Sequence, residues 1–418
     1  MRKLIKVVST FKNGVGGHYY SLLTIAELLT REFEVVIINI GHIPSPVLLK
    51  HWGGEFVFLN STNSNINKLM VEFRKAVESE NPIAIHTYDL ISHLFVRTSL
   101  DGLKCKLVHT KCGGPPVLQD YGNLSRMVVF TREDQEHLAD HGGQRIGKIH
   151  RIENRIGKVS VPVDEINQIT KKYALGGLTI LRICRISRAY RKSIISGIRL
   201  VEFLKSCGYD CKLVVIGTIQ DDEVFQELSS ELKDVVWLTS DEFTCNASRL
   251  LGLGDIVIGT GRSFMEAALI GLLTMVPSDT SFYPVPVLKL NFEEALAANF
   301  SPRYEPSGVV GTNEFIEEFV LNSKKRKEAS KFMTAQAKLR FSIESASQEY
   351  FSLYDFDDRL IKTGFFEREI DRLRLKRFYS NQASSKKMFN NSFSSILKWM
   401  YLFAMRVYRG SREIKNID

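Results

Sequence analysis

Short runs rich in Val and Ile alternate with longer segments of helical periodicity, and this alternation restricts the fold more than any other feature of the sequence. The apolar runs predict parallel strands buried on both faces, and the segments between them predict the helices that cover those faces. Apolar residues spaced by three or four between Tyr19 and Leu29 predict the first helix. The strands predicted in this first series are 5–9, 34–40, 55–59, 83–87, 106–110 and 127–131.

A second series of the same kind follows a polar break at 157–177 that contains Pro162 and the pair Gly176-Gly177. Two series predict an α/β protein with two tandem Rossmann-like doubly wound domains, and ligands in such sheets bind at the carboxyl ends of the strands. We therefore expect an interdomain cleft. The second series of strands is 178–184, 211–217, 235–239, 255–260 and 273–278. The expected divisions are an N-terminal domain 1–165, a C-terminal domain 170–335, a returning helix 336–355 and a basic tail 356–418.

The six cysteines form no CxxC pair, so we expect reduced thiols and no metal site. The apolar run before Lys12 is too short for a signal peptide, and no stretch has the roughly 20 apolar residues of a membrane-spanning helix. These features predict a cytoplasmic protein.

The first strand-to-helix turn, "NGVGGHYY", invites a dinucleotide-binding interpretation. The fingerprint G-x-G-x-x-G is incomplete, because Gly14 and Gly16 are followed by Tyr19 at the third glycine position, and no P-loop lysine follows. What remains is a bare helix N-terminus at Gly16 and Gly17, which can donate amides to an anion or let a ligand approach closely. The alternative is a tight turn with no ligand.

The segment "DIVIGTGRSFMEAALIGLLTMVPS" (255–278) predicts a second turn of this kind. Amides at Gly259 and Gly261, the Ser263 hydroxyl and the Arg262 guanidinium suit a diphosphate, and Glu266 is placed to accept hydrogen bonds from sugar hydroxyls. The alternative is a simple ion pair between Arg262 and Glu266 at i and i+4.

Basic residues without an intervening acid follow the first strand of the second domain. Arg185 lies just past the predicted strand end and Lys192 opens the next helix, so both could stabilise a departing nucleotide diphosphate. His109, at the end of a first-domain strand, is the candidate to lie beside the reacting sugar, and His86 is a weaker candidate. For both histidines the alternative is a hydrogen-bonded structural role.

These motifs together resemble the GT-B nucleotide-sugar glycosyltransferases, and more closely the retaining glycosyltransferase family 4. The similarity covers about residues 1–355 and rests on Gly16-Gly17, "VH" at 108–109, "IHRIENRIG" (149–157) with Asn154, Arg185 with Lys192, "GDIVIGTGRSFMEAALIGLLTMV" (254–276) and "RFSIESASQEYFSLY" (340–354).

The resemblance implies transfer of a sugar from a nucleotide-diphosphate donor to a saccharide acceptor, with retained configuration and without a metal or other cofactor. It implies catalytic roles for His109, Arg185, Lys192 and Glu266, and donor binding at Gly16, Gly17, Gly259, Gly261, Arg262 and Ser263. The chain departs from the family at Ile258, where a glutamate is usual, and at Cys184, where a glycine is usual. Two alternatives therefore stay open, a sugar-nucleotide 2-epimerase and a non-catalytic partner subunit of the same shape.

The positive charge is concentrated in the tail. The chain has a net charge of +9, and residues 321–418 hold 21 Lys and Arg against 11 Asp and Glu. The segment 393–409 shows helical apolar spacing with flanking basic residues and Trp399, which is typical of a helix lying on a membrane surface or packed on a protein. The tail carries no recognised nucleic-acid motif. We expect peripheral attachment to the inner face of a membrane and a lipid-linked acceptor in polysaccharide or O-antigen-type synthesis.

Overall fold

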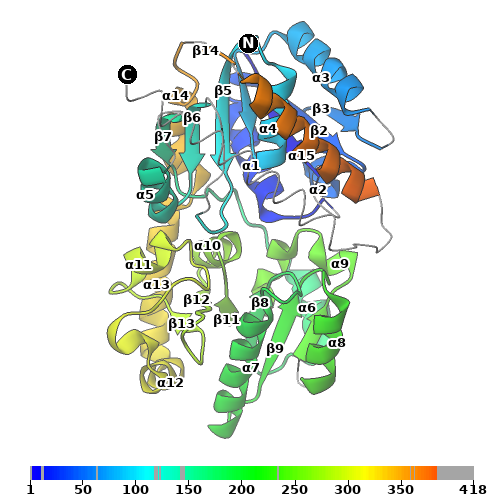
Figure 1. The fold of residues 1–418 in the computed structure, drawn as a ribbon. Coiled ribbons are helices and arrows are strands. Elements are labelled where there is room, and N and C mark those ends of the chain that lie inside the picture. Colours follow the sequence, from blue (N-terminus) through cyan, green and yellow to red (C-terminus); the bar gives the residue numbers. More distant parts are fainter. Residues whose placement is uncertain are drawn as a thin grey trace.

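The computed structural model contains two parallel α/β sheets in two domains, the first above the second in Figure 1. Within the residues that it describes, no helix is both long and apolar enough to cross a bilayer. The described residues are 2–10, 14–62, 65–116, 121, 124–141, 146–232, 235–357, 359–361 and 363–383.

The N-terminal sheet has the strand order β3-β2-β1-β4-β5-β6-β7, parallel throughout, and β14 (Arg359–Leu360) pairs antiparallel with β5. The order reverses between β1 and β4, so a crevice opens at their carboxyl ends. The strands are β1 (Arg2–Ser9), β2 (Phe33–Gly41), β3 (Glu55–Asn60), β4 (Ala84–Thr87), β5 (Lys104–Lys111), β6 (Leu124–Val129) and β7 (Ile146–Arg151), and the helices are α1 (Gly17–Leu29), α2 (Pro46–His51), α3 (Ile66–Glu80), α4 (Leu90–Ser99) and α5 (Arg132–His141).

The C-terminal sheet has the order β10-β9-β8-β11-β12-β13, with only β13 antiparallel, and its reversal lies between β8 and β11. The strands are β8 (Leu178–Ile183), β9 (Cys211–Ile216), β10 (Val235–Leu238), β11 (Ile256–Ile258), β12 (Leu273–Val276) and β13 (Val285–Pro286). The helices are α6 (Val163–Lys172), α7 (Arg191–Ser206), α8 (Asp222–Glu231), α9 (Asp241–Thr244), α10 (Arg262–Leu269), α11 (Phe292–Ala297), α12 (Asn313–Leu321) and α13 (Ser323–Arg340), with 3₁₀ segments η2 (Ala247–Leu253) and η3 (Gly308–Gly311).

The chain then returns to the N-terminal domain (Figure 1). After η4 (Ile343–Ala346), helix α14 (Ser347–Ser352) places Tyr350 and Tyr354 in the N-terminal core. The Tyr354 hydroxyl lies 2.5 Å from the amine of Lys6, which is fully buried and also 3.0 Å from Nδ1 of His86. Burial lowers the pKa of Lys6, and its amine joins the returning segment to the centre of the sheet.

The predicted fold class of two tandem Rossmann-like domains is confirmed. Strand β7 was not among the predicted strands, because its sequence "IGKIHR" alternates with polar residues and half of it is exposed at the sheet edge. Strand β3, expected to be buried, is likewise an edge strand of intermediate exposure.

Part of the basic tail is a folded element of the N-terminal domain. Helix α15 (Phe365–Ala383) packs on α4 and α3 and buries Leu375 and Tyr379. Asp371 accepts a 2.7 Å hydrogen bond from Nε of Arg97 on α4, and both side chains are at least 96% buried. The predicted membrane-surface helix at 393–409 lies outside the described residues.

We expect Asp371→Ala to destabilise the protein by about 3–5 kcal/mol, because it leaves the Arg97 charge buried without its carboxylate. Urea denaturation measures the loss. As a control, Glu369→Ala breaks an exposed pair with Arg372 and should cost under about 1 kcal/mol. Equal losses in the two variants would show that the buried pair is not what holds α15.

Candidate functional site

The start of α1 presents bare backbone at the carboxyl edge of the first sheet. A Cβ added to Gly17 would meet no atom within 4 Å, and one added to Gly16 would meet only the neighbouring rings of His18 and Tyr19. Gly14 differs, because its φ of +70° and the close Pro46 ring require glycine. A Cβ at Gly16 would lie 3.2 Å from Nδ1 of His18, so the ring would have to shift, whereas packing does not explain Gly17, which leaves the helix start open to a ligand.

The turn from β11 to α10 is tight, and several of its polar groups already have partners. A Cβ on Gly259 would lie 2.4 Å from Cα of Phe264. The Gly261 amide donates to the Asn299 carbonyl at 3.0 Å, and Ser263 Oγ bonds the backbone of Thr260. Two of the groups predicted to hold a diphosphate are thus used inside the turn.

Arg262 and Glu266 form the ion pair that the sequence left as an alternative, but the pair is buried rather than on a solvated face. Arg262 Nε lies 2.7 Å from Glu266 Oε1, and the other carboxylate oxygen accepts from Ser248 at 2.6 Å. The two side chains are 16% and 6% exposed. Glu266 therefore holds Arg262 in place, and each of its carboxylate oxygens already has a protein partner.

Arg262 also joins the two domains. Its guanidinium donates to the Arg155 carbonyl at 3.3 Å and to Thr24 at 3.4 Å, and it lies 5.7 Å from the Tyr20 ring. The Tyr20 hydroxyl in turn accepts from the Asn246 amide at 3.0 Å. These contacts link α1 with η2 and α10. The sequence offered Arg262 as a donor ligand and gave no sign of its partners on α1.

The basic loop after β8 faces the start of α1. Arg185 is exposed and donates to the Tyr190 hydroxyl at 2.8 Å, and Lys192 is exposed in the first turn of α7. Burial, and then the positive charge of Arg185, lower the pKa of His18 to about 4. The imidazole of His18 is therefore neutral at physiological pH, and a cation of the second domain stands beside the glycine turn of the first.

His109 does not reach this place. It is 2% exposed, its Nδ1 lies 2.8 Å from the Thr87 hydroxyl, and its ring lies among those of His93 and Tyr121. Burial, followed by the neighbouring charges of His93 and Lys111, lowers its pKa. His86 is equally enclosed, between Lys6 and Thr110. Both histidines are enclosed and hydrogen-bonded within the first domain.

The sequence analysis did not single out Arg182, which is completely buried beneath the basic loop. It donates to the Ile258 carbonyl at 2.9 Å and to the Ser193 hydroxyl, and no acid of the described chain pairs with it. It therefore places a fixed positive charge between the start of α7 and the end of β11. An arginine inside the apolar run "LTILRIC" was the available signal.

The described residues contain no cluster of three or more His, Cys, Asp or Glu side chains that could hold a metal ion. All six cysteines are free thiols. The cations described above at this edge of the two sheets are Arg182, Arg185, Lys192 and Arg262.

Two facing Rossmann-like domains, closed by C-terminal helices that return to the first, constitute the GT-B fold, and solved structures bear this out. A glycosyltransferase from Rickettsia africae is 16% identical with a TM-score of 0.62, over 85% of this chain and 98% of its own. HepE from Anabaena, in complex with UDP and glucose, is 13% identical with a TM-score of 0.63, over 85% and 100%. A putative UDP-N-acetylglucosamine 2-epimerase from Listeria monocytogenes is 13% identical with a TM-score of 0.54, over 84% and 95%.

No protein-family model and no curated protein matches the sequence. At these identities the structural matches establish the shared fold, and that fold occurs here in both glycosyltransferases and an epimerase.

We expect Arg262→Met to lower the free energy of unfolding by about 2–3 kcal/mol, because the Glu266 carboxylate is left buried with only Ser248 as a partner. Loss of the contacts to α1 should also increase the radius of gyration in small-angle scattering. Arg199→Met, which removes a cation that stacks on Phe282 within the second domain, is the matched control. An unchanged radius in Arg262→Met would contradict the bridging role.

Proposed function

We propose that the protein is a glycosyltransferase that moves a sugar from a nucleotide-diphosphate donor to a saccharide acceptor with retained configuration. The observation that carries the proposal is Arg185 of the second domain standing beside His18 at the open glycine turn of the first. A diphosphate between them would be stabilised by cations at the point where charge develops as the nucleotide leaves. UDP and glucose bound to HepE, which shares the fold, support a nucleotide-sugar donor.

The residues take the following roles in this proposal. Arg185 and Lys192 contact the diphosphate, with the buried charge of Arg182 behind them, and Gly16 and Gly17 let the donor approach α1. Gly259 and Gly261 shape the α10 turn, whose Arg262 and Ser263 lie at the donor edge. Glu266 acts by holding Arg262, and the enclosed His109 is assigned to the support of β4 and β5 rather than to contact with sugar. These cations make a metal unnecessary for leaving-group stabilisation.

The acceptor part of the proposal rests on the sequence of the tail. A membrane-surface segment at 393–409 would hold the N-terminal domain, to which α15 is fixed, near a lipid-linked saccharide. This corresponds to polysaccharide or O-antigen-type synthesis at the inner face of a membrane.

Two other functions have specific support. The epimerase that shares the fold favours a 2-epimerase acting on the same donor without an acceptor. Ile258, which is fully buried where an acid is usual in the resembled family, favours a partner subunit that binds nucleotide without turnover.

One series of measurements separates the three functions. Thermal stabilisation by UDP-, GDP-, ADP- and CMP-sugars identifies the donor, and the stabilising donor is then incubated with and without a panel of saccharide acceptors. Transfer with the donor's anomeric configuration, followed by NMR, supports the proposal. Epimer formed without acceptor supports the epimerase, and stabilisation without any turnover supports the subunit. No stabilisation by any of them would reject all three.

We expect Arg185→Ala to reduce the transfer rate by about 100-fold or more, because a cation at the leaving group is removed. The variant should unfold at the wild-type temperature, since the hydrogen bond from Arg185 to the Tyr190 hydroxyl is on the exposed surface. Arg188→Ala, in the same exposed loop, is the control and should retain activity. Wild-type turnover in Arg185→Ala would remove this residue from the mechanism.

Nucleotide binding should take up a proton at mildly acidic pH. The free protein keeps His18 neutral down to about pH 4, and a bound diphosphate raises that pKa through its negative charge. At pH 5.5 we expect more proton uptake in the wild type than in His18→Asn, and at pH 8 no difference. Calorimetry of UDP binding in two buffers of different ionisation enthalpy measures it. Equal uptake by the two proteins at pH 5.5 would show that His18 does not face the diphosphate.

A further inference from the structure

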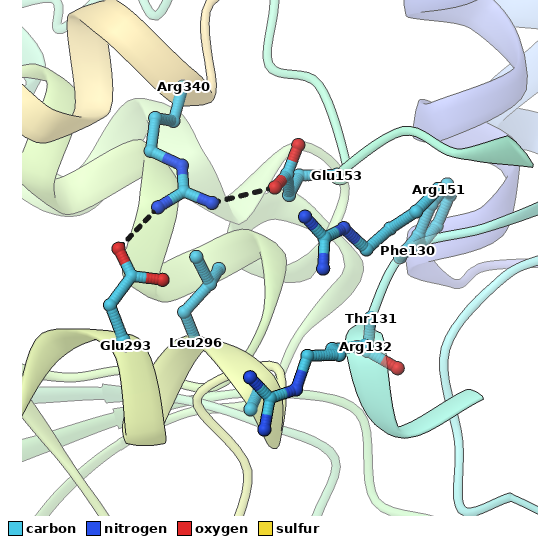
Figure 2. Close-up of a pocket in the computed structure, with 9 residues that line it drawn as sticks. Phe130, Thr131, Arg132, Arg151, Glu153, Glu293, Leu296 and Arg340 are labelled. Carbon is cyan, nitrogen blue, oxygen red and sulfur yellow. Dashed lines mark hydrogen bonds and ion pairs between the residues drawn. The ribbon is translucent and has the colours of Figure 1, made fainter. Parts of the chain in front are cut away.

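A second site lined by cationic side chains lies between the domains, on the side of β6 and β7. It is a cavity of about 170 Å³. Figure 2 shows Arg132 and Arg151 entering it from the first domain, with Leu296 and Glu293 of α11 opposite and Arg340 of α13 above. Three arginines and two glutamates, Glu153 and Glu293, therefore line one small space.

The two acids are already engaged. Arg340 donates to Glu153 at 2.8 Å and to Glu293 at 2.6 Å, and Arg155 lies 3.5 Å from the other oxygen of Glu153. Burial would raise the pKa of Glu153, but the hydrogen bond from Arg340 and the charges of both arginines outweigh it and leave the pKa below its ordinary value. Glu153 is thus ionised and shared between two cations.

The other two arginines keep unused donors. In the part of the chain that the structure describes, Arg132 pairs with the exposed Glu136 alone, through Nε at 3.1 Å. Arg151 is exposed to the cavity, and no acid within the described ranges lies at ion-pairing distance from it. A guanidinium has five N–H donors in a planar fork that matches an oxyanion. The cavity therefore has an excess of positive charge and of donors.

The cavity is next to the candidate donor site. Ala297 lines it, and two residues later the Asn299 carbonyl accepts from the Gly261 amide in the α10 turn. From the first domain, a Cβ on Gly113 would lie 3.5 Å from the Asn299 amide nitrogen. One turn of chain, 297–299, thus separates the cavity from the β11–α10 turn.

We propose that this cavity binds a single oxyanion, a phosphate or carboxylate carried by a saccharide ligand, through Arg151 and Arg132 beside the Arg340 bridge. That the saccharide is the acceptor rests on the proposed function, whereas binding of the anion does not. The site lies between the two domains, so the bound anion contacts both of them.

Calorimetric titration with inorganic phosphate at constant ionic strength tests the site. Arg151→Ala should weaken phosphate binding about tenfold or more, since a charge-assisted contact is removed. Arg377→Ala, an exposed arginine of α15 outside the cavity, should leave it unchanged. Arg185→Ala removes the cation of the donor site and should also leave this binding unchanged. Weakening in Arg185→Ala with none in Arg151→Ala would assign the phosphate to the donor site and overturn the proposal.

Glucose 6-phosphate and glucose distinguish the source of the anion. A sugar phosphate that binds more tightly than inorganic phosphate, and loses affinity in Arg151→Ala, supports an anionic saccharide. Equal affinities of the two phosphates would overturn the saccharide part and leave a site for the free anion. The whole proposal would be overturned if phosphate bound to neither protein while neutral glucose bound wild type and Arg151→Ala with the same affinity. These outcomes do not depend on whether a nucleotide sugar is turned over.

Discussion

The arrangement of the two domains depends on one largely buried side chain, Arg262. It begins α10, is neutralised by Glu266 on its own helix, and reaches across to the Arg155 carbonyl and to Thr24 on α1. A buried guanidinium must satisfy its donors, and only the first domain supplies the remaining acceptors. The hydrogen-bond donors of Arg262 therefore connect the α10 turn to α1. Both helices follow strand-to-helix turns at the facing edges of the sheets.

Near Arg262, some arginines pair with an acidic side chain and others do not. Arg303 pairs with Glu133 and Arg340 with Glu153 across the domains, whereas Arg182, Arg185 and Arg151 have no acid among the described residues. Paired cations stabilise the contact between domains. Unpaired cations at an interdomain edge are available to anions, which is why the proposals concern a diphosphate at Arg185 and an oxyanion at Arg151.

Segments near the C-terminal end of the described chain pack into the N-terminal domain. Tyr354 reaches the buried amine of Lys6, Asp371 pairs with Arg97, and the Tyr379 hydroxyl lies 3.2 Å from Ser9 at the carboxyl end of β1. Helix α15 thereby stands beside the strand that leads into the glycine turn.

The sequence by itself determined that there are two series of strands and helices and where most of the strands lie, because buried parallel strands need continuous apolar runs that can be recognised without tertiary contacts. The edge strand β7 lacks such a run and was missed. The sequence also indicated Gly16-Gly17, Arg185 and the α10 turn as residues at the carboxyl edges. Only the tertiary structure decided that His109 and His86 are enclosed, that Glu266 is bound by Arg262 and Ser248, and that no acid in the described part of the chain pairs with Arg182 or Arg151. Burial and pairing depend on which distant segments meet, and residue spacing along one chain does not contain that information.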